Sequence, residues 1–221
     1  MKSTPKAGLL APQLPKSLPS RKIEALETGA EVTACRITGC DLSGQDAASL
    51  LFDQVSLERI ILQQNRMDRL RMFDVRASAC DFSGAGWEKA HLRRVEFSGC
   101  RLIGIQLLEA QLEHVHFKEC SLEGAIFASA VFKSARFSHC NLRGTLFEQA
   151  DLSGVVFRDC DLAQASLSGA KLQGADFRGS VLNGMKVGAG DFQGATIDSS
   201  QAVQVVALMG VTVQEFETLQ D

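Results

Sequence analysis

The feature that most constrains this chain is a period of five residues. Between Ile37 and Ile197, nearly every residue whose number ends in 2 or 7 is large and apolar. An α-helix repeats every 3.6 residues and a flat strand every two, so either element would spread these side chains over all of its faces. The period therefore excludes an ordinary helical or flat-sheet domain over this stretch.

Size alternates inside each five-residue unit. The position two residues before the large one holds a small or compact side chain, as at Ala85, Ala90, Val95 and Cys100. Glycine recurs two residues after the large one, where a tight corner needs it. A chain that turns a corner every five residues explains the pattern, with the large and the small side chain inward and the other three outward.

A second period of 20 residues predicts the number of sides. Three inward columns keep one residue type over successive units of 20. These columns are Phe97, Phe117, Phe137, Phe157 and Phe177; Leu102, Leu122, Leu142, Leu162 and Leu182; and Cys80, Cys100, Cys120, Cys140 and Cys160. Four corners per coil follow, and about eight coils at the strand spacing of about 4.8 Å predict a rod near 40 Å long.

The repeat unit resembles that of the pentapeptide-repeat family, whose motif is approximately A-(D/N)-L-x-x. Ala150-Asp151-Leu152-Ser153-Gly154 and Cys160-Asp161-Leu162-Ala163-Gln164 carry the resemblance. It implies an all-β solenoid, the right-handed quadrilateral β-helix. Inward positions are less regular between residues 45 and 77, for example at Asn65 and Met67, and we interpret this stretch as degenerate coils.

Composition changes divide the chain into three parts. Residues 1–30 hold all four prolines beside several lysines, which predicts a flexible tail. Residues 31–197 form the β-helix, and residues 198–221 a C-terminal helix and tail. Asp198 and Gln201 favour a helix start, and Gly210 a stop. Apolar residues at helical spacing follow the start: Ala202, Val205, Val206 and Met209. This helix either caps the open end of the rod or, as the resemblance implies for some relatives, joins two copies into a homodimer.

Charge and cysteine content restrict the partners and the cellular compartment expected for the protein. The 23 Lys and Arg residues nearly balance the 26 Asp and Glu residues, so we expect no direct nucleic-acid binding and no membrane attachment. No apolar run reaches the ~18 residues of a membrane span, and Pro12 and Pro15 interrupt the first apolar stretch. We expect a cytoplasmic protein whose seven cysteines are reduced.

Motifs for chemistry are missing from the sequence. A column of cysteines offers a line of thiols rather than four ligands around one point, and the four histidines occupy outward positions. We therefore expect no catalytic residues, no metal and no cofactor.

Outward apolar residues suggest where a partner binds. Ile126 and Leu146 lie one coil apart, and Leu108 projects from the same side of the rod. The sequence predicts a non-catalytic protein-interaction scaffold with an unknown protein partner. The resemblance also supplies an alternative, a DNA-mimicking modulator of a type II topoisomerase (DNA gyrase). That alternative predicts acidic outward columns, whereas the column from Asp41 through Ile61 and Asp81 to Arg101 is mixed.

Overall fold

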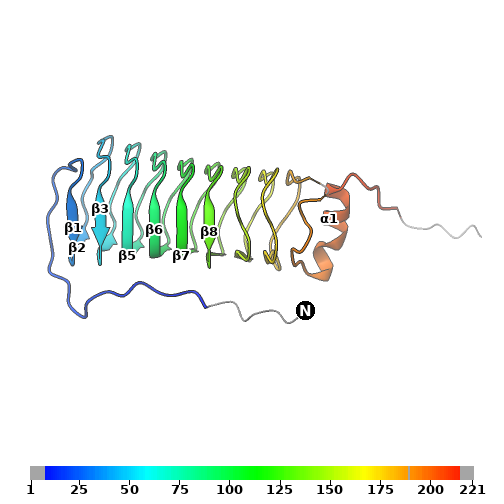
Figure 1. Cartoon of the computed structure of the whole chain (residues 1–221), viewed down its shortest axis with the longest axis horizontal. Coiled ribbons are helices and arrows are strands. Elements are labelled where there is room, and N and C mark those ends of the chain that lie inside the picture. The colour runs from blue at the N-terminus through cyan, green and yellow to red at the C-terminus, as the bar shows by residue number, and fades with distance from the viewer. Residues whose placement is uncertain (1–7, 189, 215–221) are drawn as a thin grey trace, which may run out of the picture.

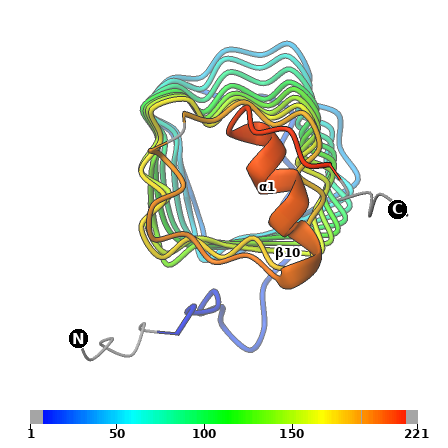
Figure 2. The same ribbon diagram turned by 90° about the vertical axis from the view of Figure 1, so that its right-hand side faces the viewer.

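The chain forms one parallel β-solenoid that ends in a short helix. The computed structural model describes residues 8–188 and 190–214. Figure 1 shows the stacked coils from the side, and Figure 2 shows their four-sided cross-section. The strands are β1 (Glu31–Thr33), β2 (Arg36–Thr38), β3 (Leu51–Asp53), β4 (Ser56–Glu58), β5 (Arg71–Ser78), β6 (His91–Ser98), β7 (Gln111–Lys118), β8 (Val131–Lys133), β9 (Arg136–Ser138) and β10 (Val156–Arg158). A 3-10 turn, η1 (Ser199–Gln201), leads into α1 (Ala202–Leu208).

The four sides of the rod are named here by their inward columns. Face A holds the column from Ile37 to Phe177, which is followed in the chain by face B from Leu42, face C from Ala47 and face D from Phe52. Strands β2, β4, β9 and β10 lie on face A, and β1, β3 and β8 on face D. The longer β5, β6 and β7 run from face D onto face A.

Every pairing between neighbouring coils joins residues 20 apart. Phe97 pairs with Phe117 in the parallel ladder of β6 and β7. On face B, where short bridges replace strands, one column of paired residues runs through eight coils: Asp41, Ile61, Asp81, Arg101, Ser121, Asn141, Asp161 and Val181. This register confirms the quadrilateral β-helix of about eight coils. The irregular stretch between residues 45 and 77 keeps the register, and Asn65, Met67 and Met72 are buried.

Phenylalanine rings stack along the inside of face A. Neighbouring ring centroids lie 5.0 Å apart for Phe97 and Phe117, 4.8 Å for Phe117 and Phe137, and 5.1 Å for Phe137 and Phe157. The ring planes are nearly parallel, and these side chains are fully buried. Burying one such ring contributes about 1.5–3 kcal/mol, so the column is a main source of stability.

The corners require a left-handed backbone. Gly104 and Gly124 have φ angles of 63° and 62°, and residues with side chains adopt the same angle, for example Arg94 at 52° and His114 at 54°. This conformation costs a residue other than glycine about 1–2 kcal/mol. The recurring glycines therefore remove strain, and neighbouring coils hold the other corners in place.

The cysteine column has a role beyond size. Besides the carbonyl two residues before it, each thiol from Cys80 to Cys140 has an acceptor in the previous coil. The Cys80 thiol lies 3.5 Å from the carbonyl of Leu57, and the Cys140 thiol 3.3 Å from that of Phe117. Both of these contacts join residues 23 apart, and the Ser180 hydroxyl makes the same contact with the carbonyl of Phe157, at 3.3 Å. Each side chain thus satisfies its polar hydrogen inside a dry core while tying one coil to the previous one.

Substituting Phe137 with alanine tests the stacked core. We expect Phe137→Ala to lower the free energy of unfolding by about 3–5 kcal/mol, because it leaves a cavity between two rings that cannot collapse. Chemical denaturation followed by circular dichroism measures the change, with Lys133→Ala, at an exposed position, as the control. Equal stability of the two variants would contradict the stacking.

Candidate interaction surfaces

The predicted partner patch lies on face C. Ile126 and Leu146 pair directly in the parallel register. Gln106 precedes Ile126 in this column, and Leu108 lies two residues beyond Gln106 in the same coil. All three apolar side chains are half-buried. Ser166, the next residue in the column, is buried and donates to the Glu148 carboxylate at 3.0 Å. The structure thus brings Ile126 and Leu146 together as a shallow apolar strip with a polar end.

The C-terminal segment covers the open end of the last coil. The Gln201 amide nitrogen donates to the carbonyls of Phe177 and Ser180, at 2.7 and 2.6 Å. Its amide oxygen accepts from the backbone N–H of Asp198, at 2.9 Å, and completes the predicted capping box. Gln201 is buried, so its side chain takes the place of a further coil of backbone.

Asp198 extends this cover. Its carboxylate accepts from the backbone N–H of Gly179, at 2.8 Å, and from the hydroxyl and N–H of Ser200. Together these bonds, with the Ser200 hydroxyl contributing most, lower the pKa of Asp198 below its usual range. The carboxylate is therefore charged at neutral pH and stays a hydrogen-bond acceptor.

Apolar residues are exposed on the outer side of this end. Among the predicted helix residues, Val205 is buried and Val206 half-buried, whereas Ala202 and Met209 face solvent. Leu208 packs with Val205 against the core. The exposed apolar side chains at this end are Val203, Met209, Val211 and Val213, of which Val203 is 59% exposed.

An N-terminal strap, residues 8–20, follows face A along the rod. In Figures 1 and 2 it leaves the first coil and runs back beneath the coils toward their C-terminal end. Near its base, the Arg36 N–H donates to the Pro19 carbonyl at 2.9 Å. Farther along, the Gln13 N–H donates to the Asp74 carboxylate at 2.8 Å, and the Leu10 N–H lies 3.4 Å from His114 Nδ1.

Asp74 occupies the corner between faces D and A. Its buried carboxylate accepts a hydrogen bond from Arg94 Nε at 2.6 Å, besides the bond from Gln13. Burial by itself raises the pKa of Asp74, but the hydrogen bonds from Arg94 and Gln13 outweigh it and leave the pKa lowered. Beside this corner, the guanidinium of Arg93 lies 5.4 Å from the ring centre of Phe73.

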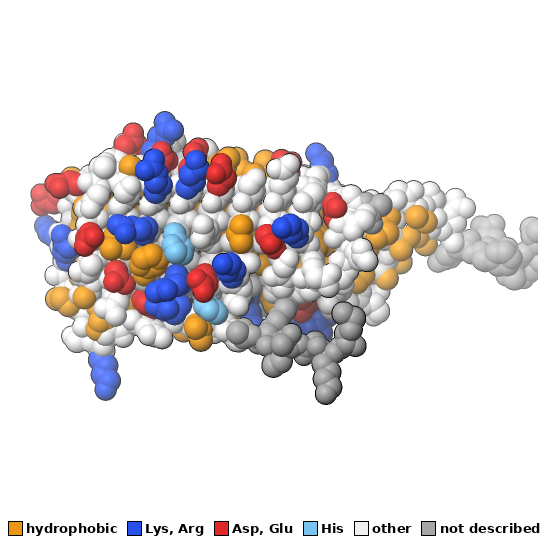
Figure 3. All heavy atoms as spheres, in the orientation of Figure 1, with side chains coloured by type: hydrophobic (Ala, Val, Ile, Leu, Met, Phe, Trp, Pro, Cys, Tyr) orange, Lys and Arg blue, Asp and Glu red, His pale blue; other side chains and the backbone are white. Residues whose placement is uncertain are grey.

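Opposite charges alternate along the sides of the rod. Arg76 pairs with Glu96 at 3.3 Å, one coil apart on face A, and Arg101 pairs with Asp81 at 3.4 Å on face B. Figure 3 shows acidic and basic side chains interspersed over the face that it presents. These exposed pairs contribute little stability, but they break up any continuous acidic stripe.

Residues 70–143 and 130–205 match the family model described as pentapeptide repeat region. The matches cover more than half of the chain. The chain belongs to the pentapeptide-repeat family. No curated protein matches this pentapeptide-repeat chain.

Solved structures of three pentapeptide-repeat proteins are similar to it. Trypsin-treated QnrB1, a plasmid-mediated fluoroquinolone resistance protein, is 18% identical with a TM-score of 0.46, covering 81% of this chain and 100% of QnrB1. HetL from the cyanobacterium Nostoc, involved in heterocyst differentiation regulation, is 20% identical with a TM-score of 0.26, covering 79% and 91%. Rfr23 from the cyanobacterium Cyanothece is 14% identical with a TM-score of 0.22, covering 76% and 91%. Similarity at this level transfers no partner or activity.

Groups that could support chemistry are dispersed in this pentapeptide-repeat chain. Over residues 8–188 and 190–214, no three His, Cys, Asp or Glu side chains gather as metal ligands. His116 lies 3.1 Å from the Ser138 hydroxyl, and burial lowers its pKa. No helix in the described part of the chain has the length and apolar character to cross a membrane.

Sequence reasoning missed the strap surface. The contacts of Leu10 and Gln13 join residues 104 and 61 positions apart, respectively, and no repeat marks them. The sequence did contain one indication of this site. Asp74 and Arg94 occupy the same corner position in consecutive coils, a position that glycine often fills.

Substituting Gln201 tests the C-terminal cover. We expect Gln201→Ala to lower the free energy of unfolding by about 1–3 kcal/mol, because two buried carbonyls lose their donor. Thermal denaturation measures the change, and light scattering detects end-to-end association of the uncovered coils. Gln193→Ala, at an exposed position of the last turn, is the control. A melting curve equal to that of the control would show that Gln201 does not hold this end.

Proposed function

We propose that this protein is a non-catalytic scaffold that binds another protein through the sides of its rod. The observation that supports this proposal is the regular outward grid. Residues on each face recur every 20 positions on a core that is filled with side chains. Such a rod holds a fixed array of groups without internal rearrangement, which lowers the entropic cost of binding.

The strip of Leu108, Ile126 and Leu146 on face C is the proposed contact surface. Half-buried aliphatic side chains lose the rest of their exposed area when a partner covers them. The neighbouring ion pair of Lys89 and Glu109, at 3.7 Å, supplies a polar border. Apolar centres with polar borders are typical of protein interfaces.

A DNA-mimicking modulator of a type II topoisomerase is the alternative function. It requires a long acidic face in place of the phosphates of a duplex. On face B, Asp81 pairs with Arg101, and Asp161 pairs with Arg143 at 3.2 Å. This neutralisation favours the general scaffold over the gyrase partner.

A second copy of the chain is a further proposed partner, at the C-terminal end. Val203 on α1, with Met209, Val211 and Val213 beyond it, exposes apolar area beside a rigid end. Pairing two such ends would bury this area and leave the sides of both rods accessible.

Partner capture with Leu146→Glu tests the face C proposal. Wild-type protein and the variant are used as parallel baits in extract of the native cells, and bound proteins are identified by mass. We expect one partner to be lost from the variant, because a carboxylate in the strip would be buried without a counter-ion. Val131→Glu, at an exposed aliphatic position on face D, is the charge-matched control. A partner retained by both variants would contradict the proposed surface, whereas capture of topoisomerase subunits would favour the alternative.

Sedimentation equilibrium tests the homodimer. We expect the wild-type chain to show a concentration-dependent dimer, and the double variant Val203→Glu, Met209→Glu to remain a monomer with an unchanged melting temperature. Both side chains are exposed, so folding does not depend on them. A monomeric wild-type chain at all concentrations, or a dimer that survives in the variant, would contradict this proposal.

A further inference from the structure

The strap is an extended peptide seated on the outside of a finished rod. Its chain direction is opposite to the progression of the coils, since Gln13 lies at Asp74 and Leu9 at Arg136. The apolar side chains Leu9, Pro12, Leu14 and Leu18 are half-buried, whereas Leu10 between them is 49% exposed. The strap therefore presents apolar side chains to the rod at intervals of two to four residues, as a bound peptide does.

The rod carries a fixed hydrogen-bond acceptor beneath the strap, the carboxylate of Asp74. Arg94 holds the Asp74 carboxylate in place, and one of its oxygens accepts the Gln13 N–H. The bond uses backbone rather than side-chain atoms of the strap. Any extended chain with an N–H group at this point could take the same bond, so recognition by Asp74 does not depend on the sequence of residues 8–20.

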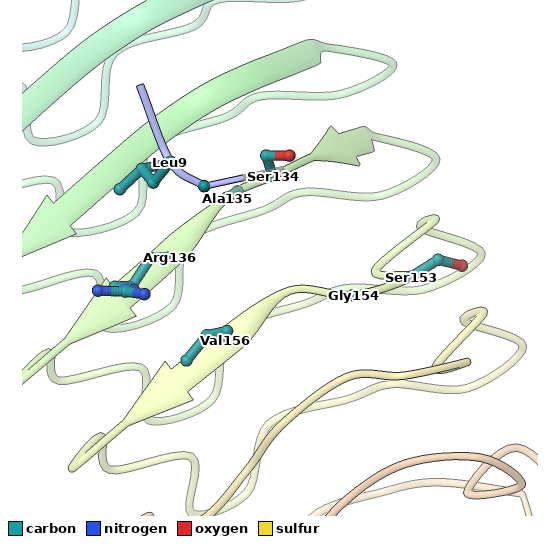
Figure 4. A pocket seen from close by; sticks show the side chains of 8 residues that line it. Leu9, Ser134, Ala135, Arg136, Ser153, Gly154 and Val156 are labelled. Carbon is teal, nitrogen blue, oxygen red and sulfur yellow. The ribbon is translucent and has the colours of Figure 1, made fainter. Parts of the chain in front are cut away.

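The strap fits the rod loosely. Figure 4 shows its end, where Leu9 lies near Ala135 and Arg136. A hollow of about 250 Å³ remains between Leu9 and the rod, bordered by Arg136 and Val156. A second hollow of about 350 Å³ lies along Pro12 and Leu14, next to Arg76. Side chains of the strap leave these open hollows unfilled and so make fewer dispersion contacts with the rod than a better-fitting segment would.

The amino-acid composition of the strap favours reversible binding to the rod. Pro12, Pro15 and Pro19 restrict the unbound chain to extended forms, which reduces the entropy lost on docking. The covalent link through residues 21–30 keeps the strap at an effective concentration of about millimolar beside the rod. The weakly bound strap can thus cover face A of its own rod and still be displaced by a competing segment.

We propose that face A, with the corner at Asp74, is a docking site for an extended, proline-containing segment of a partner protein, and that residues 8–20 occupy this site as an internal competitor. The inference rests on the proposed scaffold function and names the partner class for a surface other than face C. The shared features of strap and partner are a backbone N–H for Asp74 and aliphatic or proline side chains, two to four residues apart, for the hollows.

A labelled peptide tests the proposal on the full-length protein. The probe is a fluorescein-labelled peptide of residues 8–20, and a scrambled peptide of the same composition is its control. The double variant Leu14→Asp, Leu18→Asp releases the strap by placing carboxylates against the rod. Fluorescence anisotropy measures binding. We expect the released variant to bind the probe at least ~10-fold more tightly than the wild type, because the internal competitor is gone.

Matched variants on two faces locate the binding surface. Val156 lines the hollow on face A, and Val181 occupies the equivalent outward position on face B. In the released background, Val156→Asp should weaken probe binding ~10-fold or more, and Val181→Asp should not. Equal effects of the two substitutions would overturn the assignment to face A. Leu146→Glu lies on face C and leaves face A unchanged. The result of the probe-binding test is therefore independent of the result of the partner-capture test.

Trypsin reports whether the strap is seated. Cleavage after Lys16 should be faster in the released variant than in the wild type. Equal cleavage rates would show that the strap does not protect this site, and faster cleavage without probe binding would show that the surface accepts no free segment. A wild-type dimer that dissociates in the released variant would identify a second copy as the occupant. Each of these three results overturns the proposal.

Discussion

The register of 20 residues between coils is the constraint on which the rest of the structure depends. It pairs Phe97 with Phe117 and at the same time carries backbone hydrogen bonds such as that from Ile61 N–H to the Cys40 carbonyl, at 2.9 Å. A slip of one residue would turn the rings outward and move the thiols away from their carbonyl acceptors. Core packing, corner geometry and backbone pairing therefore favour the same alignment and reinforce one another.

A ladder of this kind has no intrinsic end. Its first and last coils present unpaired backbone, and the chain satisfies the two ends differently. At the C-terminal end, side-chain amides and carboxylates of Gln201 and Asp198 replace backbone partners. At the N-terminal end, the Leu26 N–H donates to the Gln45 side chain at 2.8 Å, and the Gly29 N–H to the Ala48 carbonyl. Both ends of the ladder are therefore covered by other parts of the same chain.

The same register determines the chemistry of those sides. Outward residues 20 apart lie on neighbouring rungs about 4.8 Å apart, so an outward charge lies beside the outward residue of the next coil. Arg76 and Glu96, or Asp151 and Lys171 at 3.7 Å, thus form pairs rather than stripes. A rod with paired charges lacks the long-range field of a nucleic acid. The surfaces proposed for partners are accordingly local: the apolar strip on face C and the site around Asp74.

The sequence by itself determined the coil, the number of sides, the inward columns and the capping box of Asp198 and Gln201. Each of these depends on residues at short or fixed spacing, where side-chain size and hydrogen-bonding capacity act directly on the backbone. Tertiary structure alone decided that the thiols from Cys80 to Cys140 reach carbonyls 23 residues earlier, and that the strap lies on face A. The contact of Gln13 with Asp74 joins segments 61 residues apart through a backbone N–H that every residue except proline possesses. Such a contact leaves no pattern in the sequence, because its specificity arises only from the position that folding gives to the carboxylate.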